Sequence, residues 1–251
     1  MKMRRHNTTG ILTRSSPVRW FYKVRLKGDK VRCNVCEKNF QRFRSIGRPE
    51  INKAMCPNCY SLESTRLLWF YLSDEVLGRK NKNNVLYFEA EKAVLNRLLA
   101  NGIKVEVAGL KYLNQLNSEK RQADRLMGGQ FDVVLLSHVL EFTNDENSVF
   151  EELKRLLRPG GFVLLQTAIN WEMDRSYQLP QTTEDQERLK KYFVPGVQRI
   201  FGSNLENQLI KAGFDVEKID YADQLGGAAI KYYQLGSNGE IIFKCKKKNK
   251  I

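Results

Sequence analysis

The chain has 251 residues, 42% of them hydrophobic, which accommodates one substantial domain and a smaller module. No apolar run approaches the ~18 residues that cross a bilayer, and the basic first ten residues lack the apolar stretch of a secretory signal. These features exclude a membrane-spanning protein and predict a cytoplasmic one with reduced cysteines, and the net charge of +14 favours acidic partners.

Basic residues are concentrated at the two ends of the chain. Residues 1–32 hold ten Lys or Arg and one acid, and residues 244–250 hold five lysines. Such ends could touch nucleic acid, anionic lipid or an acidic substrate, or simply be solvated. Trp20, Phe21 and Val24 lie at near-helical spacing among these bases. They predict an interfacial membrane helix or, as the favoured interpretation, aromatic side chains docked on the body of the protein. We assign residues 1–28 to a basic arm.

Two Cys-x-x-Cys pairs follow the arm. Cys33/Cys36 and Cys56/Cys59 are separated by nineteen residues, a spacing at which four thiolates can close a tetrahedron around one zinc ion. Two disulfides or a redox pair are the alternatives, but nothing marks the chain for export and a redox motif needs only one pair. The sequence therefore predicts a zinc ribbon over residues 29–64 with a structural metal. Cys245, in a terminal strand, is expected to be an inert packing residue.

Residues 65–251 alternate between helical and strand patterns. A helix over residues 62–72, capped by Ser61, opens this part of the chain. Strands are expected near 85–88, 103–107, 131–136, 162–167, 214–219 and 240–245, with helices near 91–100, 147–157 and 204–212. The segment 131–136 is almost entirely apolar, as in strands covered on both faces. The alternation predicts a doubly wound α/β sheet.

In such sheets a ligand binds beyond the carboxyl ends of the strands, near the point where the strand order reverses. That rule singles out three loops, at residues 88–91, 108–110 and 137–142. The third loop follows the most apolar strand and is the most informative of the three.

The segment FDVVLLSHVLE at residues 131–141, followed by LKRLLRPGG at 153–161, resembles class I S-adenosylmethionine-dependent methyltransferases. The segment CPNCYSLESTRLL at residues 56–68 is similar to one bacterial branch of that superfamily, which carries an N-terminal zinc ribbon. The resemblance covers nearly all of residues 33–245. It implies a Rossmann-like, seven-stranded methyltransferase sheet and S-adenosylmethionine as the cofactor.

The resemblance also implies which residues hold the cofactor. They are expected to be Phe88, Glu89, Ala90, Glu91, Gly109, Leu110, Asp124, Ser137 and His138. In the branch the first loop reads like Ala-Pro-Glu rather than a glycine-rich turn, so Glu91 is the residue carried over. An ordinary acid in the first turn of a helix is the alternative for Glu91.

Three departures from the branch bear on the mechanism. A carboxylate for the ribose hydroxyls is expected about 20 residues beyond the first loop, where this chain has Gly109, while Glu106 lies within the strand. Phe142 replaces a second histidine, and the segment 196–202 keeps Arg199 without the neighbouring acid and imidazole. No catalytic residue is assigned. His138 is expected to line the cofactor pocket rather than act as the base, and Glu141 is an alternative base.

The leading interpretation is a methyltransferase acting on a small-molecule or glycan-type acceptor, which residues 171–233 would help to bind. Arg199 could hold an anionic acceptor or belong to an ion pair. One alternative is a vestigial domain that binds or assembles without catalysis. The other is a nucleic-acid modifying protein whose ribbon and arm grip phosphates. The mixed composition between the cysteine pairs argues against it, since Phe40 and Phe43 are expected to pack the ribbon onto the main domain.

Overall fold

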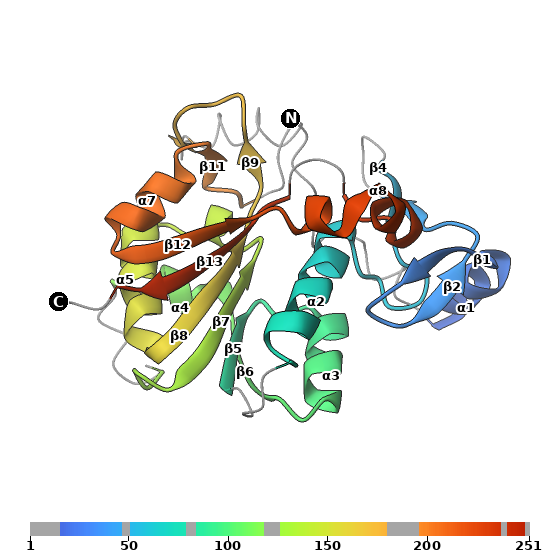
Figure 1. Ribbon diagram of the computed structural model, residues 1–251, viewed down its shortest axis with the longest axis horizontal. Coiled ribbons are helices and arrows are strands. Elements are labelled where there is room, and N and C mark those ends of the chain that lie inside the picture. The colour runs from blue at the N-terminus through green and yellow to red at the C-terminus, as the bar shows by residue number, and fades with distance from the viewer. Residues whose placement is uncertain are drawn as a thin grey trace.

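The centre of the molecule is a six-stranded sheet, shown in Figure 1. The computed structural model describes residues 16–46, 51–78, 84–117, 126–179, 196–236 and 240–248. The strands are β5 (Asn84–Phe88), β6 (Lys104–Ala108), β7 (Phe131–Ser137), β8 (Leu157–Gln166), β12 (Phe214–Ile219) and β13 (Ile242–Lys247). Their order is β12-β13-β8-β7-β5-β6, and β13 runs antiparallel to both neighbours while β6, β5, β7 and β8 are parallel.

Successive residues of the central strands face opposite layers, as the apolar sequence of β7 predicts. Val134 and Leu136 pack in one buried cluster with α5 (Glu146–Leu156) and α7 (Leu205–Lys211). Val133 and Leu135 pack in a second cluster with α2 (Glu63–Glu75) and α3 (Lys92–Ala100). The doubly wound α/β prediction is confirmed. The resemblance implied seven strands, and the described residues form six of them.

A proline-glycine turn sets the close approach of β8 to β7. Gly160 has a φ of 76°, in the left-handed region that glycine enters without steric penalty. A Cβ on Gly161 would lie 2.8 Å from the carbonyl oxygen of Phe131. The segment Arg158-Pro159-Gly160-Gly161 therefore lets the two backbones meet where a side chain would separate them.

The cysteine-bearing segment forms a small lobe at one end of the molecule (Figure 1). It contains two antiparallel pairs, β1 (Lys27–Cys33) with β2 (Lys38–Phe40) and β3 (Arg44–Ile46) with β4 (Ile51–Met55). Phe40 and Phe43 are buried in the same cluster as Leu72 of α2 and Val85 of β5. The prediction that these aromatics pack the ribbon onto the main domain is confirmed.

The predicted docking of the N-terminal aromatics is wrong. Helix α1 (Ser16–Arg25) leaves Trp20 67%, Phe21 48% and Val24 56% exposed. The helix is attached instead through Tyr22 and Leu26, which join the cluster of the ribbon. The spacing of the aromatic residues predicted the helix correctly. Which face of the helix is buried depends on the surface of the ribbon against which it packs, and the spacing does not show that surface.

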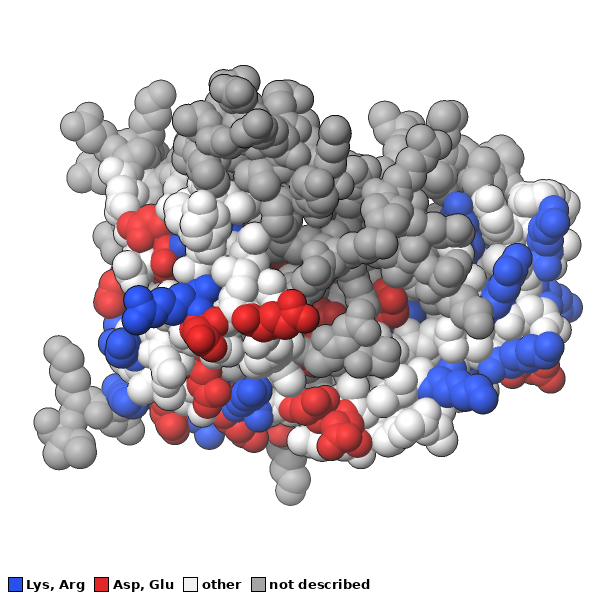
Figure 2. Space-filling view, turned by 90° about the horizontal axis from the view of Figure 1, so that it is seen from above, with Lys and Arg blue, Asp and Glu red and all other residues white. Residues whose placement is uncertain are grey.

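Basic side chains gather over the lobe end of the molecule, whereas acids and bases mix over the sheet end (Figure 2). Exposed bases of the lobe are Arg25, Lys27, Lys30, Lys38 and Arg42. Two acids, Asp29 and Glu37, lie in the same stretch.

The segments after β8 were only partly predicted. Strand β11 (Arg199–Gly202) pairs with β9 (Ile169–Asn170) and β10 (Tyr177–Gln178), forming a small sheet beyond the end of β8. Helix α8 (Tyr221–Tyr233), which contains a kink at Gly226, was not predicted. Two glycines weaken its helical pattern, and its apolar side chains pack on Leu67 of α2. Of the helices described, none combines the length and apolar character of a membrane span.

Candidate functional site

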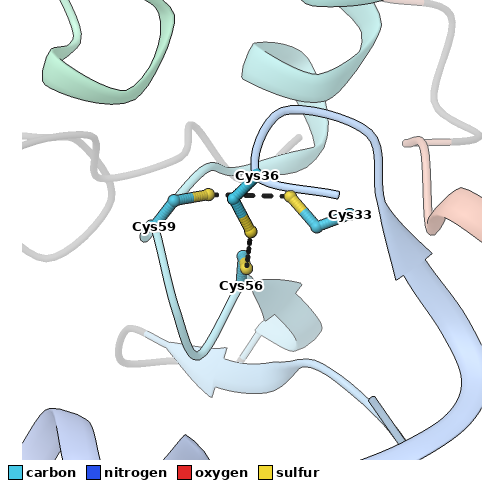
Figure 3. A group of neighbouring side chains, drawn as sticks. All are labelled: Cys33, Cys36, Cys56 and Cys59. Atoms are coloured by element: carbon cyan, nitrogen blue, oxygen red, sulfur yellow. Dashed lines mark hydrogen bonds between the residues drawn. The ribbon is translucent and has the colours of Figure 1, made fainter. Parts of the chain in front are cut away.

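The four paired cysteines converge on one point, as Figure 3 shows. Their sulfur atoms all lie within 4.8 Å of one another. The Sγ atoms of Cys33 and Cys59 are 3.6 Å apart, and those of Cys36 and Cys56 are 3.7 Å apart. Four sulfurs at the usual zinc–sulfur distance of about 2.3 Å form a tetrahedron with edges of about 3.8 Å. The residues present therefore fit a tetrahedral zinc ion.

Both cysteine pairs end in the same backbone turn. Glu37 and Tyr60, which follow the second cysteine of each pair, have φ values of 59° and 64°. The amide of Glu37 donates to the carbonyl of Cys33 at 2.7 Å, and that of Tyr60 to Cys56 at 3.1 Å. Residues other than glycine rarely adopt this conformation, so its repetition indicates that the two cysteine pairs have the same backbone geometry around one centre.

The segment from Ser61 to Arg66 connects the cysteine cluster to the sheet. The hydroxyl of Ser61 lies 3.2 Å from the sulfurs of both Cys33 and Cys59. Its predicted role as a helix cap is wrong, because α2 begins at Glu63 and Leu62 is the residue before it. The hydroxyl of Thr65 accepts from the amide of Leu62 and donates to Oε2 of Glu91 at 2.5 Å. Burial raises the pKa of the Glu91 carboxyl.

Arg66 is fully buried and ties three parts of the chain together. Its guanidinium donates to the carbonyls of Ala54 and Ser61 in the ribbon segment and of Tyr233 and Gln234 at the end of α8. It also lies 4.4 Å from the ring centre of Phe43. A buried cation needs such partners because it has lost its hydration.

The three loops singled out by the sequence meet at one edge of the sheet. Strand β5 lies between β6 and β7, so the chain order reverses there and the carboxyl ends of all three strands are adjacent. Glu89 and His138, the first residues after β5 and β7 respectively, have φ values of 47° and 52°. Strained backbone of this kind is concentrated at ligand sites, which supports a functional role for this edge.

Glu89 connects the loops after β5 and β6. Its amide donates to the carbonyl of Ala108 at 2.9 Å, and its Oε1 accepts from the amide of Leu110 at 2.6 Å. Leu110 begins the short helix α4 (Leu110–Asn114). The side chain therefore leans over Gly109, where a Cβ would lie 3.3 Å from Glu89 Oε1.

His138 is held between two carboxylates. Its Nε2 lies 2.6 Å from Oε1 of Glu240, and its Nδ1 lies 3.2 Å from Oε1 of Glu141. Although burial lowers the pKa of His138, Glu240 and Glu141 together raise it to about 10. Glu141 also accepts from the hydroxyl of Thr167 at 2.8 Å. The imidazole is thus protonated at neutral pH and already paired, so it is a poor base.

The structure brings most of the expected cofactor residues to this edge. Phe88 is fully buried in the core, so it can offer a ligand only its backbone. Ser137 donates to Oε1 of Gln166, and the amide of His138 donates to the carbonyl of Gln166. Ala90 lies between Glu89 and Glu91 and is partly buried. Asp124 lies outside the described residues.

Arg199 is part of the fold rather than of an accessible site. It is 3% exposed, pairs with Glu146 and donates to the carbonyls of Thr143 and Asn144. Of the two interpretations of Arg199 in the sequence, the ion pair is confirmed.

Sequence reasoning missed Glu240, Thr65 and Thr167. Glu240 is separated from His138 by 102 residues, and it lies just before β13 with no motif around it. Thr65 lies in the branch-like segment 56–68, which offered a signal, but its partner Glu91 could not be deduced from spacing.

Residues 75–165 match the family model described as a methyltransferase domain. The described sheet, with four parallel strands and the antiparallel β13, is compatible with this match. Residues 75–165 are therefore identified as a methyltransferase domain. Comparison with curated proteins gives no match.

Many solved structures resemble the methyltransferase domain at low identity. The Burkholderia thailandensis 1,6-didemethyltoxoflavin N1-methyltransferase is 16% identical, with a TM-score of 0.47 over 74% of this chain and 79% of that one. A glycopeptide N-methyltransferase is 16% identical, with a TM-score of 0.46 over 75% and 92%. An Archaeoglobus fulgidus methyltransferase is 13% identical, with a TM-score of 0.41 over 72% and 93%. TM-scores this low say nothing about the acceptor.

Proposed function

We propose that this protein transfers a methyl group from S-adenosylmethionine to a small-molecule or glycan-type acceptor. The observation that carries the proposal is the meeting of the loops after β5, β6 and β7 at the point where the strand order reverses. The residues in or directly beside these loops are Glu89, Glu91, Gly109, Leu110, Ser137 and His138. They are the residues proposed to surround the cofactor, with Phe88 and Ala90 contributing backbone.

The bound cofactor supplies an electrophilic methyl group on a sulfonium, which an acceptor attacks in line. The chain's own contribution is to position the acceptor and exclude water. His138 cannot take the acceptor's proton because both of its ring nitrogens face carboxylates. Glu141 is 3% exposed and bonded to His138 and Thr167, so it positions the loop rather than touching an acceptor. No catalytic residue is assigned.

We propose that one zinc ion is held by Cys33, Cys36, Cys56 and Cys59 in a structural role. A closed set of four thiolates leaves no open coordination position for a substrate. Thiolate is the form of cysteine that binds metal, and the four sulfur atoms lie within 4.8 Å of one another.

We also propose three segments: a basic arm (residues 1–28), a zinc ribbon (29–64) and a methyltransferase domain (65–251). The ribbon shares its buried cluster with α2 and β5, so this division describes the chain rather than independently folding units. Cytoplasmic location stays a prediction from the cysteine chemistry.

A peripheral contact with anionic membrane is the second role that a specific observation favours. Helix α1 presents Trp20, Phe21 and Val24 to solvent, and Arg25 and Lys27 beside them are exposed. Aromatic and basic residues on one short helix suit the interface of an acidic bilayer. Nucleic acid is less favoured, since Phe40 and Phe43 of the ribbon are buried and unavailable for stacking on bases.

Titration calorimetry with S-adenosylhomocysteine tests the proposed function. We expect saturable binding, and a ligand at 100 times its Kd should stabilise the protein by about 2.7 kcal/mol. No binding at millimolar ligand would contradict any cofactor role. Binding without methyl transfer to a panel of small molecules and glycans would support the vestigial alternative. RNA affinity that falls steeply with salt would support nucleic acid as the acceptor.

A further inference from the structure

Strand β6 lacks an acid at the position where sheets of this kind bind ribose. Such an acid stands at the end of the second strand, about 20 residues beyond the first loop. In this chain Gly109 follows β6, and the one carboxylate of the strand, Glu106, is exposed within it. The sequence alone leaves the ribose without a carboxylate.

The structure supplies a carboxylate at that place from the neighbouring strand. Phe88 of β5 pairs with Ala108 of β6 in parallel register, so Glu89 and Gly109 come next to each other at the strand ends. Adjacent strands are about 4.8 Å apart, a distance that a glutamate side chain spans. Oε1 of Glu89 lies 2.6 Å from the amide of Leu110 and 3.3 Å from the Cβ position of Gly109.

We propose that Glu89 takes over the role of the absent acid and binds the ribose hydroxyls of S-adenosylmethionine. This inference rests on the proposed function. Oε1 is fixed by Leu110, while no described residue bonds Oε2, and the side chain of Glu89 is exposed. A carboxylate with one oxygen held by a backbone amide and the other without a bond to a described residue can accept from a diol without losing its orientation.

The backbone of Glu89 supports this assignment. Its φ of 47° lies in a region that glutamate rarely occupies, and the bond from its amide to Ala108 maintains it. The hydrogen bond from the amide of Leu110 to Oε1 shows that the side chain reaches across to the end of β6. The missing side chain at Gly109 leaves the space that the carboxylate fills, so the two departures from the expected pattern compensate each other.

The test measures S-adenosylhomocysteine and its 2′-deoxy analogue by calorimetry on the zinc-loaded protein. In the wild type, removing the 2′-hydroxyl should weaken binding about tenfold, as expected for a hydrogen bond to a charged group. Glu89→Ala should weaken S-adenosylhomocysteine about 10- to 100-fold and abolish the difference between the two ligands. Glu89→Gln can still accept a hydrogen bond from the amide of Leu110, so its affinity for S-adenosylhomocysteine should lie between those of the wild type and Glu89→Ala.

A transplanted acid provides a rescue. Gly109 has a φ of −97°, which an L-residue adopts freely, so Glu89→Ala with Gly109→Asp should restore affinity to within about threefold and recover the 2′-hydroxyl preference. Gly109→Asp alone should weaken binding, because two carboxylates would share one place. Glu106→Ala is the matched control and should bind like the wild type.

The outcomes separate this inference from the proposed function. If wild type binds S-adenosylhomocysteine but Glu89→Ala binds equally well, or keeps the full 2′-hydroxyl preference, Glu89 only orders the loop and the inference is wrong. If wild type binds no S-adenosylhomocysteine, the proposed function fails and this inference fails with it. Circular dichroism of each variant distinguishes lost affinity from lost fold.

Discussion

His138 lies in a buried cluster of charged side chains, whereas the sequence alone suggested a residue that lines the cofactor pocket. The carboxylates of Glu141 and Glu240 contact its ring. The carboxyl of Glu91, just before α3, interacts with it electrostatically. A buried ring with acids at both nitrogens stabilises the loop after β7 while it is protonated. Because this stabilisation is lost when the imidazole is deprotonated, the stability of the fold should decrease at alkaline pH.

We expect the stability of the fold to decrease as pH rises from about 6.5 to about 10. The folded-state pKa of His138 is raised from 6.5 to about 10, so its stabilisation is complete below the lower value and lost as pH passes through the higher one. The upper limit is about 5 kcal/mol. Urea unfolding at several pH values measures it. His138→Gln should flatten the slope; equal slopes in both proteins would contradict the assignment.

The paired cysteines act as one element. Each pair ends in the same left-handed turn, at Glu37 and Tyr60, and Ser61 contacts the sulfurs of Cys33 and Cys59 from outside the cluster. Hydrogen bonds from an outer shell orient metal ligands and stabilise thiolates. In the segment 56–68, Ser61 therefore supports the cysteine cluster, a role that the cysteine spacing alone does not show.

We expect one zinc ion per chain, measured by elemental analysis of purified protein. Cys36→Ser should lose it and lower the free energy of unfolding by several kcal/mol, because metal binding is part of folding in such modules. Cys245→Ser is the control, since Cys245 is buried in β13 away from the cluster, and it should keep full zinc content. A metal-free wild type with native stability would rule out the structural role.

Helix α1 is an element whose exposed side is testable by itself. Trp20→Glu with Phe21→Glu should reduce binding to vesicles containing phosphatidylserine at least tenfold, since it removes apolar area and adds repulsion. Stability should change little because both side chains are exposed. Co-sedimentation measures binding, with neutral phosphatidylcholine vesicles as the control. Equal sedimentation of variant and wild type would exclude this face as the contact.

At the scale of the whole molecule, hydrogen bonds connect the cysteine cluster to the carboxyl ends of the central strands. The path runs from the sulfurs through Ser61 and the first turn of α2 to Thr65 and Glu91. Arg66 fastens the same turn to α8. Because the cysteine cluster and the proposed cofactor site share this turn, loss of order at one should weaken binding at the other.

We expect chelation of the metal to weaken S-adenosylhomocysteine binding about tenfold or more. Thr65→Val should weaken it about three- to tenfold with zinc retained, since it removes the hydrogen bond to Glu91. Ser73→Ala, which removes a hydroxyl bonded only locally to Phe70 in α2, is the matched control. Calorimetry measures the affinity for S-adenosylhomocysteine in the metal-loaded and the chelated protein. Unchanged affinity after complete zinc removal would show that the two sites are independent.

The alternation of apolar strands and amphipathic helices predicted the sheet well, because each central strand is apolar on both faces and each helix carries one apolar stripe. The predicted segment 131–136 corresponds to β7, and 85–88 to β5. Helix α8 was missed because Gly226 and Gly227 interrupt its pattern. The cap of α2 was assigned to Ser61 because local propensity favours serine there, whereas the cysteine cluster holds its hydroxyl.

The sequence by itself determined the class of fold, the position of the cysteine centre and the three loops at the strand ends, since spacing and periodicity are local properties. Only the tertiary structure decided which side chains meet. Pairing of β5 with β6 puts Glu89 over Gly109, and the return of the chain at β13 brings Glu240 to His138 across 102 residues. Contacts between distant segments depend on strand order and register, which no short stretch of residues encodes.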